Sequence, residues 1–316
     1  MNKELFGVFG DVDDFRRYRS EMSFDRVVEG GAVTVGIRDV ALGIPGRSAT
    51  YAGDDGVCVL WGEAFSPPEA TAGAAEWLLD RYADIGTDAL SGLNGSYVAV
   101  VDDGDEAVVA TDPARTWECY YADVEGTRLF GTAPDAVANH IPAPTTSQQA
   151  LREFLHLGVV LGDRTTLDEL HRTPFDGCLY ADATSELRRF VYDPADFDYV
   201  AELADRLERA FARRSRLPGD KGLLLSGGYD SRTLLAGIPD IDQCYTVGTT
   251  WSSEVDVAKR VAEQYGVPHR TLTVDERYPR FDADVVKYGH GIKESLHIHH
   301  AAYDNEIDVD TMYHGL

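Results

Sequence analysis

One stretch of the sequence decides the fold of the C-terminal half: Gly222-Leu223-Leu224-Leu225-Ser226-Gly227-Gly228-Tyr229-Asp230-Ser231-Arg232. Its leucines predict a short buried strand, Gly222–Leu225, and a helix can begin at Ser231 and run through Ala236. Between them, Ser226-Gly227-Gly228 predicts a tight turn. A glycine turn that leads into a helix N-terminus exposes backbone N–H groups, so the pocket suits an anion. Glycine fits here because a Cβ would hold the backbone away from phosphate oxygens.

Asp230 is the unexpected residue of this loop, because a carboxylate beside a phosphate is repelled unless a cation lies between them. Mg²⁺ suits that place, since it takes a few carboxylates together with phosphate oxygens. The loop is not a Walker A loop, because no Gly-Lys-Ser/Thr follows. We therefore predict that Asp230 is catalytic and a Mg²⁺ ligand, and that Ser226 and Ser231 add hydroxyl donors. The alternatives are a plain glycine turn and an acid that only favours the helix dipole.

The composition points to about two domains and a strongly acidic surface. The chain has 316 residues and a net charge of −25, from 29 Lys and Arg against 54 Asp and Glu. The acids are spread over both halves. This favours a solvated coat for a salt-adapted organism, and the alternative is an acidic surface that binds a basic partner. In both cases a nucleic-acid partner is not expected, because phosphate backbones bind basic patches.

The cysteines and the apolar runs indicate the compartment. The four cysteines are far apart in sequence and form no Cys-x-x-Cys pair, which predicts buried free thiols: Cys58, Cys119, Cys178 and Cys244. The N-terminus has no basic segment followed by an apolar run, and no run reaches the length of a membrane span. We expect a cytoplasmic protein without a membrane partner.

The first half predicts strands separated by turns, with two helices. The expected strands are Leu5–Phe9, Ala32–Ile37, Val57–Trp61, Tyr97–Asp102, Ala107–Thr111, Cys119–Asp123 and Arg128–Gly131. The expected helices are Pro68–Ile85 and a shorter one from Ser147 to Leu157, capped by Ser147.

After Asp193 the pattern changes to alternating helices and strands. We expect an amphipathic helix with one apolar face, formed by Phe197, Val200, Leu203, Leu207, Ala210 and Phe211. The strand of the glycine loop, strands Cys244–Val247 and Arg270–Val274, and helix Ser253–Tyr265 follow. This alternation implies an α/β domain with a parallel sheet and right-handed crossovers. Ligands of such sheets bind at the carboxyl ends of the strands.

Together the two halves resemble the asparagine synthetase family. Ser-Gly-Gly-x-Asp-Ser resembles the pyrophosphate loop of ATP pyrophosphatases, which cleave ATP between the α and β phosphates. The other matching segments are Leu90–Val100, Ala110–Pro113, Cys119–Tyr121, Phe130–Ala133, Tyr245–Gly248, and Glu254–Val267 with His269. The resemblance implies an antiparallel glutaminase-type α/β sandwich over residues 1–192. It implies an ATP-pyrophosphatase domain with a parallel sheet over residues 193–316.

The resemblance also implies a set of ATP-binding residues and two cofactors, ATP and Mg²⁺. The expected ATP-binding residues are Leu225, Ser226, Gly227, Gly228, Asp230, Ser231, Arg232, Val247 and Gly248. Val247 and Gly248 would meet the adenine through backbone groups, or are ordinary strand core. Arg232 stands where the synthetases have a small residue. It would reach a phosphate or a substrate carboxylate, or form a surface ion pair.

Two departures from the family pattern bear on activity. Asn2 stands where the family's glutaminase has its cysteine nucleophile, so we expect no glutamine hydrolysis. The family's later Ser-Gly-x-Gly-Ala-Asp-Glu loop would begin about where the sequence stops, at Tyr313–Leu316. The C-terminal domain is therefore expected to be incomplete as written.

The implied function is an AMP-forming carbon–nitrogen ligase that adenylates a carboxylate. The amine would be ammonia or an amine of the substrate itself, as in the beta-lactam synthetases. One alternative is a non-catalytic or partner-dependent nucleotide-binding protein, and another is an enzyme that adenylates a tRNA base. The expected partners are a small carboxylate substrate and an amine donor. Homodimers are common in the family, so a homodimer is an expectation from the resemblance alone.

Four histidines close to one another in sequence form a last candidate site: His290, His297, His299 and His300. On a helix, His297 and His300 would share a face, whereas His299 would point away. Their spacing, with Glu294 and Asp304 near, matches no metal signature. A role in lining the substrate cleft and a metal site both stay open.

Overall fold

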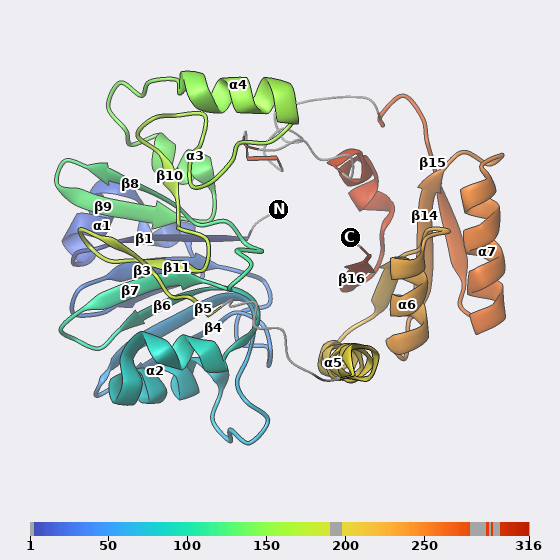
Figure 1. Ribbon diagram of the computed structural model, residues 1–316, viewed down its shortest axis with the longest axis horizontal. Coiled ribbons are helices and arrows are strands. Elements are labelled where there is room, and N and C mark those ends of the chain that lie inside the picture. Colours follow the sequence, from blue (N-terminus) through green and yellow to red (C-terminus); the bar gives the residue numbers. More distant parts are fainter. Residues whose placement is uncertain (1–2, 190–197, 279–288, 291, 293–297, 316) are drawn as a thin grey trace. The chain divides into compact units, whose positions relative to one another are not determined.

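The computed structural model describes residues 3–189, 198–278, 289, 290, 292 and 298–315. It divides into two compact units (Figure 1). Unit 1 is Met1–Asp193 together with His290–Glu294, and unit 2 is Pro194–Gly289 together with Ser295–Leu316. The division along the chain thus falls one residue after the expected one. The short segment His290–Glu294 groups with unit 1, which the sequence did not indicate.

Unit 1 contains two antiparallel sheets of six strands each. The first has the order β10-β8-β9-β1-β3-β2 and the second β12-β11-β7-β6-β5-β4. The strands of the first are β1 (Glu4–Val8), β2 (Arg26–Glu29), β3 (Thr34–Arg38), β8 (Tyr120–Val124), β9 (Thr127–Gly131) and β10 (His171–Arg172). Those of the second are β4 (Ala49–Gly53), β5 (Gly56–Phe65), β6 (Asn94–Asp102), β7 (Ala107–Thr111), β11 (Gly177–Leu179) and β12 (Thr184–Glu186).

The helices of unit 1 cover the outer faces of these sheets (Figure 1). They are α1 (Val12–Tyr18), α2 (Ala74–Ile85), α3 (Pro134–Ala138), α4 (Gln148–Leu157) and the 3₁₀ segments η1 (Glu21–Ser23) and η2 (Gly86–Gly92). Val59 and Val100 point into the core between the sheets, whereas their neighbours Leu60 and Ala99 pack in the core with α2. Both faces of the sheet are covered, so β5 and β6 are nearly continuous apolar runs. These runs are what allowed the two strands to be predicted from the sequence.

The expected strands of unit 1 are all present, Ala107–Thr111 with the same ends and the others with ends shifted, but the helix expected from Pro68 begins only at Ala74. Gly73 is its N-cap, and the segment before it, with Pro67 and Pro68, is not helical. Ser147 holds the N-cap position of α4, but its side chain makes no capping hydrogen bond. The sequence missed α1 and the short strands β2, β4, β10, β11 and β12, because they carry little periodic apolar signal.

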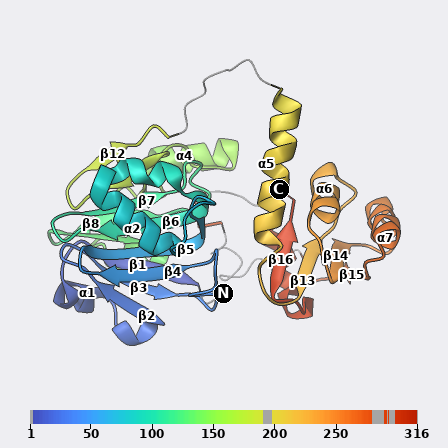
Figure 2. The same ribbon diagram turned by 90° about the horizontal axis from the view of Figure 1, so that it is seen from below.

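Unit 2 contains a four-stranded parallel sheet in the order β15-β14-β13-β16 (Figure 2). Its strands are β13 (Lys221–Leu224), β14 (Gln243–Gly248), β15 (His269–Thr273) and β16 (Thr311–His314). Its helices are α5 (Tyr199–Arg214), α6 (Tyr229–Gly237), α7 (Ser253–Tyr265) and the 3₁₀ segment η3 (Ile298–Glu306). The expected parallel α/β sheet is confirmed. The expected strand Arg270–Val274 corresponds to β15, and the sequence did not predict β16, which follows it in the chain.

The apolar face of α5 is buried less than its sequence pattern predicts. Phe211 packs in the core of unit 2, whereas Val200 and Leu203 are 79% and 59% exposed. The prediction of buried free thiols is confirmed, because all four cysteines are free and buried. None of the helices within the described residues is long and apolar enough to cross a membrane.

The strand order places the glycine loop at a defined position. β13 lies between β14 and β16, and all three run in the same direction. The loop that follows β13 therefore borders the carboxyl ends of both neighbours. This is the edge at which ligands of parallel sheets bind.

Candidate functional site

The glycine loop runs from the end of β13 directly into α6. β13 ends at Leu224, and α6 begins at Tyr229 with Gly228 as its N-cap. The first N–H groups of a helix have no partner within the helix, and an N-cap side chain normally accepts from one of them. Gly228 has no side chain to do this. The first turn of α6 therefore presents backbone donors and the positive end of its dipole at the carboxyl edge of the sheet.

Two serines hold the loop in shape. The Oγ of Ser231 accepts from the N–H of Ser226 at 3.0 Å and lies 2.9 Å from the Oγ of Ser226. The Oγ of Ser226 in turn accepts from the N–H of Gly228 at 3.1 Å. Ser231 is 3% exposed, so its hydroxyl is a buried support of the loop. The sequence predicted both hydroxyls as ligand donors, and in this structure they bond to the loop itself.

Packing within the protein does not require the loop glycines. Gly228 has φ of −74° and ψ of 167°, an extended conformation that any residue adopts. A Cβ on Gly227 would come no closer than 3.6 Å, to Val257, and one on Gly228 would approach only the Ser226 Oγ, at 3.2 Å. By contrast, a Cβ on Gly248 would lie 2.7 Å from a methyl group of Val255. A methyl group at either glycine would therefore meet no backbone atom, and Gly228 is exposed.

Asp230 is exposed on the first turn of α6, next to the end of β16. A Cβ on Gly315 would lie 2.8 Å from the Cβ of Asp230 and 2.7 Å from the backbone nitrogen of Ser231. Gly315 therefore lets the chain pass close to the helix N-terminus, a contact that the sequence did not predict. The described residues contain no group of three or more His, Cys, Asp or Glu side chains arranged for a metal. Asp230 would supply one carboxylate, which is compatible with Mg²⁺ when phosphate oxygens and waters complete the shell.

Val247 and Gly248 differ in what their backbones face. The amide of Leu225 donates to the Tyr245 carbonyl at 2.7 Å, and β13 ends there while β14 continues. Backbone groups alternate sides along a strand, so those of Val247 face the side where β13 has ended. The carbonyl of Gly248 faces β15 and accepts from the Val274 N–H at 3.1 Å. Val247 is therefore the better placed of the two for a ligand, whereas packing against α7 accounts for glycine at 248.

Arg232 folds back onto the loop. Its Nε donates to the Gly228 carbonyl at 3.0 Å, and its guanidinium carbon lies 4.7 Å from the centre of the Tyr229 ring. Tyr229 is 83% exposed, so this pair stands on the surface beside the loop. In this structure the guanidinium is held by a loop carbonyl and an aromatic ring, and its remaining N–H groups lie at the edge of the loop.

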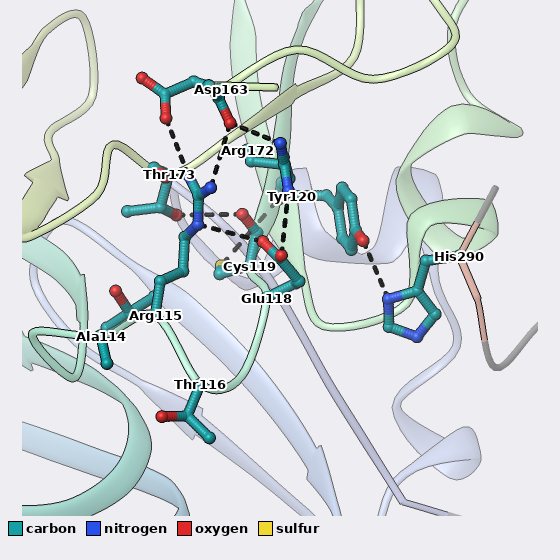
Figure 3. Close-up of polar contacts among 12 residues, drawn as sticks. Ala114, Arg115, Thr116, Glu118, Cys119, Tyr120, Asp163, Arg172, Thr173 and His290 are labelled. Atoms are coloured by element: carbon teal, nitrogen blue, oxygen red, sulfur yellow. Dashed lines mark hydrogen bonds and ion pairs between the residues drawn. The ribbon is translucent and has the colours of Figure 1, made fainter. Parts of the chain in front are cut away.

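Unit 1 contains a second dense polar cluster, around Arg115 and Arg172 (Figure 3). Arg115 contacts Glu118 at 3.2 Å and Asp163 at 2.7 Å, and its Nη1 donates to the Thr173 carbonyl at 2.7 Å. Arg172, with a side chain only 6% exposed, donates to Glu118 at 3.1 Å. Arg115 has φ of 48°, in the left-handed region that residues other than glycine rarely adopt. The two arginines and the two acids form ion pairs with one another, so we interpret the cluster as one that stabilises the fold of unit 1.

His290 is the one member of the histidine group whose side chain the structure describes. Its Nδ1 lies 2.9 Å from the hydroxyl of Tyr120 (Figure 3). Burial raises the pKa of Tyr120, so the hydroxyl stays protonated and can donate this bond. His297, like Asn2, lies outside the described residues, and so do the side chains of His299 and His300. The histidine site is therefore neither assembled nor excluded.

Comparison with known proteins finds a match over the segment that contains the glycine loop. Residues 202–280 match the family model of asparagine synthase. The carboxyethyl-arginine beta-lactam-synthase of Streptomyces clavuligerus is 29% identical over 213 residues, which cover 66% of this chain and 40% of that protein. The chain thus spans less than half the length of this relative. The matched segment contains the glycine loop, α6, β14 and α7.

Two solved structures cover 92% of this chain with weak overall similarity. One is the glutamine phosphoribosylpyrophosphate amidotransferase from B. subtilis complexed with ADP and GMP, with 13% identity, 65% of that chain covered and a TM-score of 0.33. The other is described as the allosteric regulatory enzyme of purine biosynthesis, with 14% identity, 64% of that chain covered and a TM-score of 0.34.

Proposed function

We propose that this chain is an ATP-dependent ligase that forms an amide bond, with the glycine loop and the first turn of α6 as its triphosphate site. The observation that carries the proposal is the pair of loop glycines, Gly227 and Gly228, which neither packing nor backbone conformation requires. Bare amides at the carboxyl edge of a parallel sheet suit phosphate oxygens. The match of residues 202–280 to asparagine synthase supports the same reading.

Each residue of the site has a role in this proposal. The N–H of Gly227 and the N–H groups at the start of α6 bind the β and γ phosphates, and the serine pair, which takes the amides of Ser226 and Gly228, keeps the loop in shape. Asp230 holds Mg²⁺, which would neutralise phosphate charge when bound. The backbone of Val247 faces the adenine. Arg232, already held beside the loop, adds positive charge toward a phosphate or the substrate carboxylate.

The reaction has two steps that share this site. A carboxylate oxygen of the acid attacks the α phosphorus of ATP, the bond to the bridging oxygen breaks, and pyrophosphate leaves. The loop donors bind the charge that develops on that leaving group. An amine nitrogen then attacks the acyl carbon and loses a proton, and AMP leaves with the electrons of the broken C–O bond.

We propose that the amine does not come from glutamine. Asn2 occupies the position of the family's nucleophile, and an asparagine amide is not a nucleophile at neutral pH. The named relative makes a β-lactam, a cyclic amide whose closure joins a carboxylate and an amine of one molecule. The amine here is then ammonia or a group of the substrate itself. Release of glutamate from glutamine by the purified protein would contradict this.

The direct test is exchange of labelled pyrophosphate into ATP with Mg²⁺ and a panel of amino-acid carboxylates. Exchange that depends on a carboxylate supports the ligase. ATP binding without exchange supports a non-catalytic or partner-dependent nucleotide-binding protein, and exchange that needs tRNA supports a base-modifying enzyme. Absence of ATP binding would refute the proposal. Sedimentation of the same preparation tests the homodimer.

A further inference from the structure

The peptide bond between Leu225 and Ser226 is fixed at both ends. The carbonyl of Leu225 accepts from the hydroxyl of Thr246 at 2.6 Å. The N–H of the same peptide, on Ser226, donates to the Oγ of Ser231 at 3.0 Å. This is the peptide at which β13 turns into the glycine loop. Because it is planar and rigid, its orientation decides where the following amides point.

The Leu225 carbonyl would ordinarily continue the ladder between β13 and β14. Here a side chain of β14 takes it, because β13 leaves the sheet at this residue. Thr246 is 4% exposed, so the bond is made in a dry environment in which an unpaired carbonyl is costly. The Thr246 hydroxyl is thus the group that lets the chain leave the sheet at this point.

The Thr246 hydroxyl also contacts the side chain of His269. The Nε2 of His269 lies 2.8 Å from the Thr246 Oγ1. A hydroxyl has one hydrogen, and Thr246 gives it to the Leu225 carbonyl, so the Nε2 of His269 must be the donor to Oγ1. The Nδ1 is then an acceptor, and it is buried without a partner among the described residues. Burial, with a smaller effect from the charge of Lys259, lowers the pKa of His269, which agrees with a neutral ring.

We propose that Thr246 and His269 are positioning residues that set the orientation of the glycine loop for the β and γ phosphates of ATP. They act in series, His269 on Thr246 and Thr246 on the Leu225 carbonyl, and neither touches the nucleotide. The proposal rests on the proposed function, because it assumes that the loop binds phosphates. It adds the buried Thr246 on β14 and the half-buried His269 on β15 to a site otherwise built from the loop and α6.

Nucleotide binding tests the proposal with ATP and AMP as probes. AMP lacks the β and γ phosphates, so it does not depend on the orientation of the loop. Thr246→Val keeps the shape and removes the hydroxyl. We expect the Kd for ATP to rise about tenfold, as loss of one such hydrogen bond implies. We expect the Kd for AMP to change less than about twofold. Isothermal titration calorimetry measures both.

Rescue separates this role from a loss of folding. Thr246→Ser keeps the hydroxyl and should restore ATP binding. His269→Gln keeps a donor and should bind ATP better than His269→Leu. Thr271→Val is the matched control, because Thr271 stands opposite Thr246 on β15 and its buried Oγ1 has no partner in the described structure. It should bind both nucleotides like the parent.

The outcomes separate the two proposals. Parent-like ATP binding by Thr246→Val would overturn the positioning role and leave the ligase standing. Equal weakening of ATP and AMP would overturn it too, because a loss of general structure affects both. A parent protein that does not bind ATP would overturn both proposals.

Discussion

The two polar clusters of this molecule are built in opposite ways. In unit 1, Arg115, Glu118, Asp163 and Arg172 bond to one another and to buried carbonyls, so their charges are neutralised where they stand. In unit 2, no side chain caps the first turn of α6, and the loop before it leaves room at its glycines, while serine hydroxyls accept from the amides of Ser226 and Gly228. The charged cluster is the more conspicuous, yet its two arginines and two acids are already paired with one another. A binding site is marked by donors without partners, and the number of charges does not identify it.

The largest effect is expected when the ion-pair cluster around Arg115 and Arg172 in unit 1 is broken. Arg172→Met leaves Glu118 buried without one of its two arginines. We expect the free energy of unfolding of unit 1 to fall by about 3–5 kcal/mol, the usual cost of breaking a buried ion pair on one side. Denaturant unfolding measures this. Arg188→Met, at an exposed pair with Glu186, is the control and should leave stability unchanged. If ATP binding per folded molecule fell with Arg172→Met, the cluster would be more than structural.

The second-largest effect is expected when the carboxylate of Asp230 is removed. Asp230→Ala should lower pyrophosphate exchange by about a hundredfold or more, since Mg²⁺ loses its protein ligand, an effect comparable to removing one charge-stabilising group. The melting temperature should stay near that of the parent because Asp230 is exposed. Asp256→Ala, an exposed acid in the first turn of α7, is the matched control. Full exchange activity in Asp230→Ala would remove Asp230 from the site.

A smaller effect comes from adding one methyl group to the loop. Gly228→Ala fits the backbone, so stability should fall by no more than about 1 kcal/mol, a usual cost of alanine at an N-cap, while the methyl group crowds the phosphates and raises the Kd for ATP by about tenfold. Gly237→Ala should instead lower stability and leave the Kd for ATP unchanged. Its Cβ would collide with the ring of Phe211, so stability should fall by about 1–3 kcal/mol. Calorimetric titration and thermal unfolding of both variants test this, and equal binding by parent and Gly228→Ala would contradict an open phosphate cradle.

The smallest expected effect concerns salt. The net charge of −25 makes the folded surface repel itself, and added KCl screens that repulsion. Unfolding stability of the parent should therefore rise between low and high KCl. The loss caused by Arg172→Met should not change, because a buried pair is little screened. Stability that falls as KCl is raised would contradict a salt-adapted surface.

Prediction from the sequence was most accurate where local signals agreed. The strand, the glycines and the helix start of residues 222–236 all indicated one place, and the structure has β13, the loop and α6 there. It was least accurate for short edge strands and for β16, whose pairing with β13 depends on residues about ninety positions away. No pattern of neighbouring residues predicts a strand partner so distant in the sequence.

The site shows the same division. The sequence predicts the loop residues as a site because glycine, serine and aspartate at this spacing have few other uses. Thr246, His269 and Gly315 were not found as parts of it, since their contribution is a hydrogen bond or a close approach made across strands. Gly248 was predicted to meet the adenine or to belong to the strand core, and its close contact with Val255 gives a packing reason for glycine there. Only neighbouring elements can distinguish these roles.

The sequence alone determined that a strand, a glycine turn and a helix follow one another, because these depend on neighbours in the chain. It also determined the acidic surface. Tertiary structure decided which charges neutralise one another, which strand flanks the loop, and which side chain takes the Leu225 carbonyl. Those outcomes depend on contacts between distant residues, and the distances that create them exist only after the sheets have formed.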